Sequence, residues 1–337
     1  MAATGQPLEP DTFDSDSAIS ELRNGSTDSP TPSMLTVLEE NGRTYHAMSS
    51  GKYPFPNDIV EQERLDFQHL MWTVTLGDKL CLCPKGSQKA KRVLDAGTGT
   101  GIWAMDYADA HPEAKVIGVD LSNIQPKWTP PNLTWELDDL EQDWTWSQPF
   151  DFVFVRMLAG SLKDYQDFVN QAFENLEPGG YLEMQDLSLP YRCDDGSLTE
   201  ENPVHKLSDL FLRGGRVTGR HMDKAPIYKD LMRNAGFVDI VEEQFKWPVN
   251  AWPRDPHFKT LGAWTHCNLD HGLEGLTLGL ATRNLRWSRE ETLLFCATVR
   301  KTLRSHKAHA YIPLYVVYGR KPAEAKRGDS KPPAGIQ

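Results

Sequence analysis

Residues 93–101 read VLDAGTGTG, a short apolar run that leads into three alternating glycines, and this stretch decides the fold class. Arg92–Asp95 has the composition of a buried strand, and a helix is predicted from Gly101 to about Ala110, before Pro112. Glycine tolerates positive φ and lets a ligand approach the backbone, and a helix N-terminus offers free amide donors. The stretch therefore predicts a ligand site between a strand and a helix.

Strand and helix signals alternate on both sides of this turn. The further strands are predicted at Lys115–Asp120, Leu133–Leu137, Phe150–Arg156, Tyr181–Asp186, Phe237–Phe245 and Ala310–Arg320. Helices are predicted over 58–80, from about Lys163 to Leu176, over Ile227–Ala235, and from the capping box at Ser288 to about Arg304. Strands separated by helices favour an α/β fold, with a doubly wound, mostly parallel sheet of seven strands.

The chain divides into one domain and two polar ends. Residues 1–38 are acidic and rich in Ser, Thr and Pro, and together with the tail 323–337 they are predicted to be disordered. The domain spans 39–322. Two stretches inside it, 187–224 and 247–287, do not fit the alternation and are predicted to be helical and aromatic insertions that form a lid over a substrate.

Composition excludes several classes of protein. A net charge of -11 argues against direct nucleic-acid binding, and no apolar run approaches the roughly 20 residues that span a bilayer. The first residues lack the pattern of a signal peptide, so a cytoplasmic location is expected, with a nuclear one left open. Five scattered cysteines fit a reducing compartment, and Cys81 and Cys83 lack the spacing of a zinc site, so no metal is expected.

The acids that follow the next two strands favour an adenosine-containing ligand. A dinucleotide fingerprint would need glycine where Ile102 stands, which argues against a nicotinamide-dependent oxidoreductase. Asp120 ends the second strand and can accept hydrogen bonds from both ribose hydroxyls. Asp138 and Asp139 follow the third strand, and we favour Asp139 as the acceptor for the adenine amine.

These motifs together resemble the class I S-adenosylmethionine-dependent methyltransferases. The glycine turn, the acid at Asp120, the Asp138-Asp139 pair and the turn at Pro178-Gly179-Gly180 carry that resemblance. The segments GTGTGIWA (97–104), DLSNIQP (120–126) and RMLAGS (156–161) look more narrowly like the fungal LaeA-like methyltransferases of secondary metabolism, as do NGRTYH (41–46), YPFPND (53–58) and YGRKP (318–322). The resemblance covers about residues 38–322.

The resemblance implies a Rossmann-like fold whose last strand is antiparallel between its neighbours, and S-adenosylmethionine as cofactor. The cofactor-binding residues it implies are Asp95, Gly97, Thr98, Gly99, Asp120, Leu121, Asp138 and Asp139. Tyr45 and Tyr53 would close over the site from the N-terminal segment. Arg156 would lie near the methionine end, or would instead pair with one of the local carboxylates.

The function expected from these residues is methyl transfer to O, N or C of a small-molecule intermediate in secondary metabolism. The weak candidates for a general base are Asp186, His205, His221 and His266, with His271 beside the last. The alternative is a LaeA-like nuclear regulator that acts through protein partners. The acidic N-terminal segment is compatible with such partners but does not require them.

Overall fold

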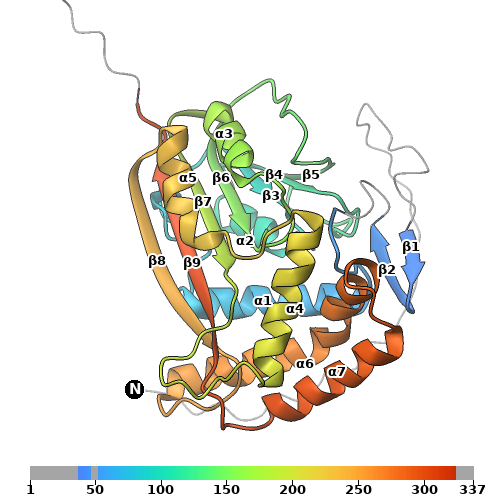
Figure 1. Ribbon diagram of the computed structural model, residues 1–337. Helices are drawn as coiled ribbons and strands as arrows, with labels where there is room; N and C mark the ends of the chain where they lie inside the picture. The colour runs from blue at the N-terminus through green and yellow to red at the C-terminus, as the bar shows by residue number, and fades with distance from the viewer. Residues whose placement is uncertain (1–36, 47–51, 324–337) are drawn as a thin grey trace, which may run out of the picture.

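The structure, a computed structural model, describes residues 37–46 and 52–323 and is built around one seven-stranded sheet (Figure 1). The strand order is β5-β4-β3-β6-β7-β9-β8. All pairs from β5 to β7 are parallel, whereas β9 runs antiparallel to both of its neighbours. This order confirms the doubly wound sheet and the single reversed strand. The strands are β3 (Arg92–Ala96), β4 (Lys115–Asp120), β5 (Leu133–Leu137), β6 (Phe150–Arg156), β7 (Leu176–Leu187), β8 (Val238–Pro248) and β9 (Tyr311–Arg320).

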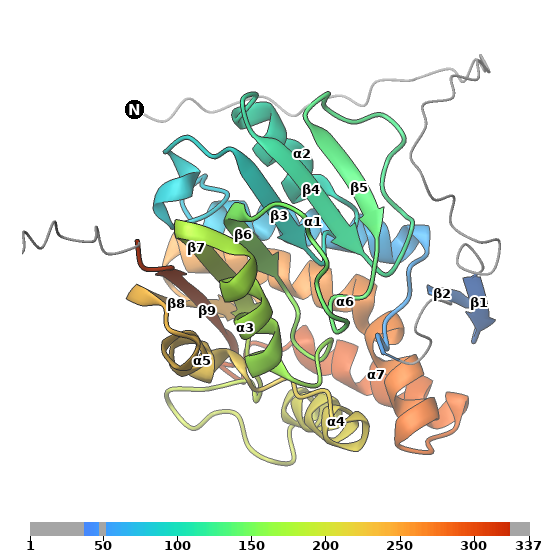
Figure 2. The same cartoon turned by 90° about the horizontal axis from the view of Figure 1, so that it is seen from above.

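Helices cover the two faces of the sheet, as Figure 2 shows from above. On one face α2 (Ile102–Ala110) brings Trp103 against Phe154, with the ring centroids 3.6 Å apart. On the other face α3 (Tyr165–Asn175) and α5 (Tyr228–Ala235) pack on β7, β8 and β9. Because β3, β4 and β6 are buried on both faces, their side chains are apolar almost without interruption.

A further group of helices lies beyond the carboxyl ends of the parallel strands, in the lower part of Figure 1. It comprises α1 (Ile59–Thr75), α4 (Pro203–Thr218), α6 (Pro256–Asn284) and α7 (Arg289–Leu303). These helices share one hydrophobic cluster with the adjacent ends of β8 and β9, which includes Trp72, Leu207 and Trp247. Since α4 and α6 lie inside 187–224 and 247–287, each of the two insertions contains a long helix.

Helix α6 contains four glycines in its 29 residues, and three of them face the N-terminal segment and α1. A Cβ atom on Gly272 would lie 2.4 Å from Arg64, and one on Gly275 would lie 2.6 Å from Arg43. A Cβ atom on Gly279 would lie 2.7 Å from the carbonyl oxygen of Pro54. Glycine weakens a helix by about 1 kcal/mol per residue relative to alanine, and here it allows close packing.

Several predicted boundaries need correction. Strand β7 begins at Leu176, so Pro178-Gly179-Gly180 lies within the strand rather than before it, at a register irregularity opposite β6. Helix α1 ends at Thr75, and two short 3₁₀ helices, η1 (Pro84–Gly86) and η2 (Ala225–Ile227), join other elements. The capping box at Ser288 is present. None of the helices in the described residues is both long and apolar enough to cross a membrane.

The ends of the chain fall largely outside the described residues. Of the predicted disordered segments 1–38 and 323–337, the structure describes only residues 37, 38 and 323. Residues 37 and 38 belong to β1 (Val37–Glu40), which pairs with β2 (Arg43–His46) in a small antiparallel sheet of its own. The domain therefore begins slightly earlier than expected.

Candidate functional site

The glycine turn leaves β3 at the carboxyl edge of the sheet and forms a fixed backbone surface. Gly97, Gly99 and Gly101 have φ values of 79°, 59° and 84°, a region that L side chains rarely adopt. The N–H groups of Gly97 and Thr98 both donate to the carbonyl oxygen of Val119 at 2.9 Å, which ties the turn to β4. The turn then runs directly into the N-terminus of α2.

Asp95 precedes the turn, is buried, and lines the same cavity as the glycines. The hydroxyl of Thr98 donates to its Oδ2 at 2.6 Å. Burial raises the pKa of Asp95 to about 7, although the bond from Thr98 acts in the opposite direction. The carboxyl therefore ties Thr98 of the turn to the end of β3.

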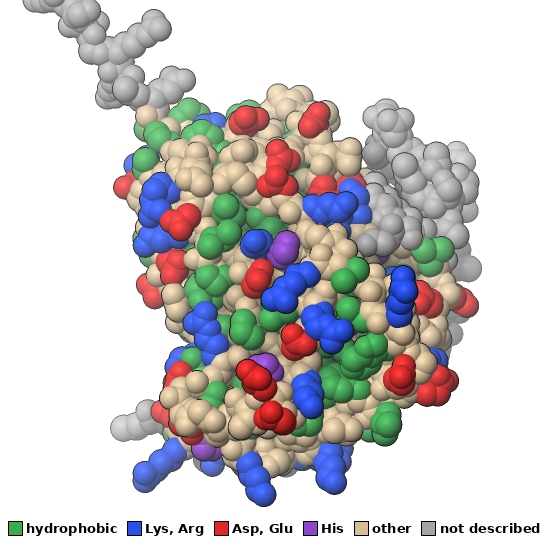
Figure 3. Space-filling view, in the orientation of Figure 1, with side chains coloured by type: hydrophobic (Ala, Val, Ile, Leu, Met, Phe, Trp, Pro, Cys, Tyr) green, Lys and Arg blue, Asp and Glu red, His purple; other side chains and the backbone are tan. Residues whose placement is uncertain are grey.

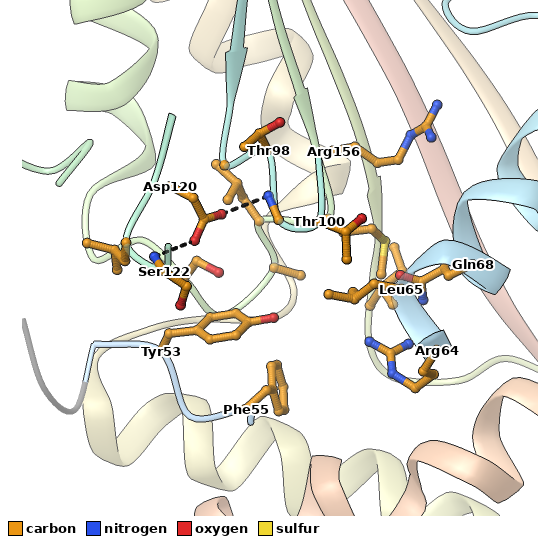
Figure 4. Close-up of a pocket in the computed structure, with 18 of the residues that line it drawn as sticks. Tyr53, Phe55, Arg64, Leu65, Gln68, Thr98, Thr100, Asp120, Ser122 and Arg156 are labelled. Carbon is orange, nitrogen blue, oxygen red and sulfur yellow. Dashed lines mark hydrogen bonds between the residues drawn. The ribbon is translucent and has the colours of Figure 1, made fainter. Parts of the chain in front are cut away.

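Asp120 ends β4 and faces the turn across the cavity (Figure 4). Its Oδ2 accepts the N–H of Gly99 at 2.8 Å, and its Oδ1 accepts the N–H of Ser122 at 2.9 Å. Burial raises the pKa of Asp120, and these backbone bonds oppose that shift. A carboxylate has about four lone-pair sites, so Asp120 keeps capacity to accept hydroxyl groups of a ligand.

Asp138 and Asp139 follow β5 and line the same end of the cavity, as does Leu121. Lys52, from the N-terminal segment, forms an ion pair with Asp139 and a second one with Glu141 at 3.2 Å. The segment before α1 is thereby connected across the cavity to the loop after β5. No pattern in the sequence pointed to Lys52, because its partners lie almost 90 residues away.

Tyr53 and Phe55 close the cavity from below in Figure 4, and Tyr53 was predicted to do so. Their rings meet edge to face at 5.2 Å. Tyr45 does not line this cavity in the described part of the chain. It is buried against α6 instead, with the guanidinium of Arg283 4.2 Å from its ring centre, beside Gly279.

Beyond the turn the same cavity continues into an apolar chamber, and the whole encloses about 250 Å³. The chamber wall comes from α1, α4, α6 and the strand ends of the second half of the sheet. Its members include Trp72, Leu187, Tyr191, Phe211, Met222, Trp247, Leu269 and Ile312. Most of these residues come from the insertions or border them, which is where a substrate lid was expected.

Arg156 stands where the polar and apolar parts of the cavity meet, at the end of β6. Its Nε donates to Oε1 of Gln185 at 2.7 Å, and its Nη2 donates to the carbonyl oxygen of Leu80 at 3.2 Å. The guanidinium carbon lies 5.5 Å from the ring centre of Trp72 and 5.3 Å from that of Phe154. Burial lowers the pKa of Arg156 to about 10, so the guanidinium remains charged at neutral pH.

His69 on α1 lies beside Arg156 and also lines the cavity. Its Nδ1 is 3.0 Å from Nη1 of Arg156, and its Nε2 is 2.9 Å from Oδ2 of Asp106 on α2. Among the described residues Arg156 has no ion pair with a carboxylate, so the alternative role predicted for it is not seen there. The sequence gave no reason to single out His69.

Comparisons with known proteins agree with this geometry. A family model described as a methyltransferase domain matches residues 74–243. Methyltransferase pytC of Aspergillus terreus is 38% identical over 301 residues, which cover 88% of this chain and 93% of that protein. The chain belongs to the class I S-adenosylmethionine-dependent methyltransferases.

Two further relatives place this methyltransferase among the LaeA-like proteins, as the sequence motifs predicted. The secondary metabolism regulator LAE1 of Cochliobolus heterostrophus is 35% identical, over 88% of this chain and 98% of that protein. The probable methyltransferase tdiE of Emericella nidulans is 34% identical, over 86% of this chain and 91% of that protein. The similarity thus extends over nearly the full length of proteins named as methyltransferases and of a protein named as a regulator.

The methyltransferase does not bring the predicted candidates for a general base to its cavity. Asp186 is buried behind the chamber, where it accepts the hydroxyl proton of Tyr228 at 2.8 Å, and burial raises the pKa of Asp186 to about 7. His205, His221 and His266 are likewise absent from the cavity lining in the described chain, as is His271. His205 lies on α4, His221 in the loop after it, and His266 and His271 on α6, so spacing along the sequence was a poor guide.

The methyltransferase also places a third group beside Cys81 and Cys83, which the sequence did not reveal. The two sulfurs and a carboxylate oxygen of Glu183 lie within 4.8 Å of one another, and all three residues are buried. Glu183 accepts the N–H of Leu82 at 2.9 Å and that of Cys83 at 2.6 Å. The carboxylate therefore anchors the loop after α1 to β7.

Proposed function

We propose that this methyltransferase transfers a methyl group to an oxygen, nitrogen or carbon of a small-molecule intermediate in secondary-metabolite biosynthesis. One observation carries the proposal: the cavity continues from the glycine turn into a chamber walled by apolar side chains such as Trp72, Phe211 and Trp247. Sites for small molecules are concave and mostly apolar, with a few placed polar groups. The names of two relatives support it: pytC is named a methyltransferase, and LAE1 is named a regulator of secondary metabolism.

In this proposal the polar half of the cavity holds S-adenosylmethionine. Asp120 accepts the ribose hydroxyls, and Asp139 lies at the adenine end with Asp138 and Leu121. The backbone of the glycine turn approaches the ligand closely at Gly99, where a Cβ atom would have only Leu65 within 4 Å, at 3.9 Å. The fit rests on the orientation of Asp120 and on the open backbone of the turn. Arg156 lies at the methionine end, where the chamber begins.

When bound, S-adenosylmethionine supplies an electrophilic methyl group carried by a sulfonium. The chain supplies position and environment. Walls from α1, α4 and α6 hold the acceptor in line with the methyl group, which can account for most of the acceleration of a displacement. Tyr53 and Phe55 close the cavity and exclude water, which suits a reaction that disperses charge.

The second candidate function is that of a nuclear regulator acting through protein partners, and the similarity to LAE1 favours it. The net charge of -11 argues against direct nucleic-acid binding under either function. For the enzyme we propose a cytoplasmic location, and for the regulator a nuclear one. Microscopy of a fluorescently tagged full-length chain separates the two.

Comparison of metabolites between a strain that carries the gene and one that lacks it tests the proposal. For the enzyme we expect a single unmethylated intermediate to accumulate, and the purified protein should methylate it with S-adenosylmethionine. Parallel loss of many unrelated metabolites would overturn the proposal in favour of the regulator. A chain with Asp120→Ala, returned to the deletion strain, should fail to restore the methylated product.

A further inference from the structure

The contacts of His69 assign its tautomer. A guanidinium can donate hydrogen bonds but cannot accept them, so Nδ1 of His69, 3.0 Å from Nη1 of Arg156, must present a lone pair. The proton of the neutral ring is then on Nε2, which donates to Oδ2 of Asp106 at 2.9 Å. His69 is therefore held with its basic nitrogen toward Arg156 and its N–H toward a carboxylate.

This arrangement contains the parts of an acid–base site. A base oriented by a carboxylate, with a cation beside it, is the geometry that removes a proton from a nucleophile. His69 is almost buried, whereas the side chain of Asp106 is 51% exposed. A proton taken up by the ring can therefore leave to solvent on the Asp106 side, away from the chamber.

The surroundings of the pair restrict the shape of the acceptor. Trp72 lies one helical turn beyond His69 on α1, and its ring packs against that of Trp247 at 5.2 Å. Both rings line the cavity, together with Tyr191 and Phe211. Aromatic walls favour a flat, apolar partner, because stacked or edge-to-face rings contribute beyond their buried area.

We propose that His69, oriented by Asp106, is the general base of the methyl transfer, and that Arg156 holds the oxyanion it creates. The acceptor class that follows is a flat compound with an acidic hydroxyl, a phenol or an enol, and the reaction is O-methylation. This inference rests on the proposed function and specifies the acceptor of that same site. No carboxylate of the described residues competes for Arg156, whose other partners are neutral.

The step balances within these groups. The acceptor hydroxyl replaces the direct hydrogen bond between the two side chains, so that it donates to Nδ1 of His69 and accepts from Nη1 of Arg156. Its proton passes to Nδ1, and the oxygen forms a bond to the methyl carbon. The carbon–sulfur bond breaks with its electron pair left on sulfur. The resulting imidazolium, stabilised by Asp106, releases its proton to solvent.

The first test measures the ionisation of a bound phenol without turnover. The full chain, saturated with S-adenosylhomocysteine, is titrated with 4-nitrophenol about one pH unit below its pKa, and the phenolate is followed by absorbance. We expect bound probe to be mostly phenolate in the native protein. Arg156→Met and His69→Gln should bind the probe without ionising it. An unshifted spectrum, or no saturable binding, in the native protein overturns the inference.

The second test separates a base from a structural residue. With S-adenosylmethionine, His69→Gln should lower kcat for 2-naphthol, a weakly acidic hydroxyl, by roughly 10²-fold or more. It should leave kcat nearly unchanged for 4-nitrophenol at a pH where that probe is already ionised. Asp106→Asn should act in the same direction but less strongly. An equal loss on both acceptors would mean that His69 only supports the fold.

Several charged or titratable groups surround the pair and must be considered in any pH profile. Besides Asp106 and Arg156, they are Asp95 from β3, Glu183 from β7 and Cys81 from the loop after α1. The matched control is His271→Gln, a substitution of the same kind at an exposed position on α6, outside the cavity lining. It should change neither readout.

Failure of this inference and failure of the proposed function give different results. If calorimetry shows tight binding of S-adenosylmethionine, and amines or carbon acids are methylated while phenols are not, the acceptor class is wrong and the methyltransferase function stands. If S-adenosylmethionine does not bind the native chain, the proposed function itself fails. Where the native chain binds S-adenosylmethionine, His69→Gln should bind it with a similar affinity.

Discussion

The two halves of the cavity are built in different ways. The cofactor half is formed by consecutive strand ends and by backbone groups, and its main residues lie between Asp95 and Asp139. The acceptor half is formed by side chains of α1, α4 and α6 and by the ends of β7, β8 and β9, from Trp72 to Ile312. The first half is polar and local in sequence, and the second is apolar and assembled from distant segments.

This difference indicates in which half of the cavity amino-acid substitutions can be tolerated. A backbone site depends on φ values and on a few carboxylates, so substitutions there affect binding of the cofactor directly. A wall of apolar side chains can change shape when residues such as Phe211 or Met222 are substituted, while the sheet is unchanged. On the face seen in Figure 3, charged and apolar side chains are intermixed, so the contrast between the halves is not visible there.

The largest expected effect comes from Gly99→Asp in the cofactor half. The variant adds left-handed strain of about 1–2 kcal/mol and places a second carboxylate beside Asp120. Affinity for S-adenosylmethionine should fall by roughly 10³-fold in calorimetry. Gly179→Asp is the matched control, since Gly179 also has positive φ (87°) but lies outside the cavity lining. Equal loss in the two variants would mean that strain alone explains the effect.

Asp120→Ala should have the next largest effect, because it removes the acceptors for the ribose. A hydrogen bond to a charged group contributes about 1.5–3 kcal/mol, so the dissociation constant for S-adenosylhomocysteine should rise by roughly 10- to 100-fold. Asp138→Ala, at the same end of the cavity, should have a smaller effect than Asp139→Ala. The reverse order would correct our choice between those two residues.

Phe211→Ala tests the acceptor half alone. Removal of this ring from the wall formed by α4 loses about 1.5–3 kcal/mol of apolar burial, so the KM for the acceptor should rise about 10-fold. Affinity for S-adenosylmethionine should stay within about twofold. A large fall in cofactor affinity at native melting temperature would show that the two halves are coupled and would break the comparison.

The last prediction concerns the pH dependence of stability rather than binding, and it involves Asp186, which lies behind the acceptor half. Burial raises the pKa of Asp186 to about 7, so the native state binds this proton more tightly than the unfolded chain does. The contribution of the protonated Asp186 carboxyl to the free energy of unfolding is thus present at low pH and is lost as the pH rises from about 4 to 7. The free energy of unfolding of Asp186→Asn minus that of the native chain should rise across this window, by about 1 kcal/mol per pH unit or less. A stability difference that falls as the pH rises would contradict the raised pKa of Asp186.

Local patterns in the sequence predicted the strands around the polar half of the cavity well. The limits of β4, β5 and β6 are as predicted. For β4 and β6 the reason is that a strand buried on both faces is a short apolar run with clear ends. The carboxylates that come directly after these strands could be predicted to lie close together, since the strand ends meet at one edge of the sheet. Gly97, Asp120 and Asp139 line the cavity for that reason.

The acceptor half could not be predicted in the same way. Helix α6 has glycines at positions where α1 and the N-terminal segment approach it, so its sequence lacks the composition of a long helix. His69 lies on α1, which was predicted, but its role depends on Arg156, 87 residues away. Tyr45 was placed over the cavity and instead packs on α6, because a two-stranded sheet turns its ring that way.

The two ion pairs of Lys52 have a consequence for the release of product that can be measured by varying ionic strength. Its ammonium group joins the N-terminal segment to Asp139 and Glu141 at the adenine end, and its side chain is only 25% exposed. In the proposed binding mode the nucleoside lies behind this bridge, so we expect release of S-adenosylhomocysteine to require the separation of two ion pairs. Salt screens such pairs, so turnover limited by product release would quicken as salt is raised, and Lys52→Met would remove that dependence.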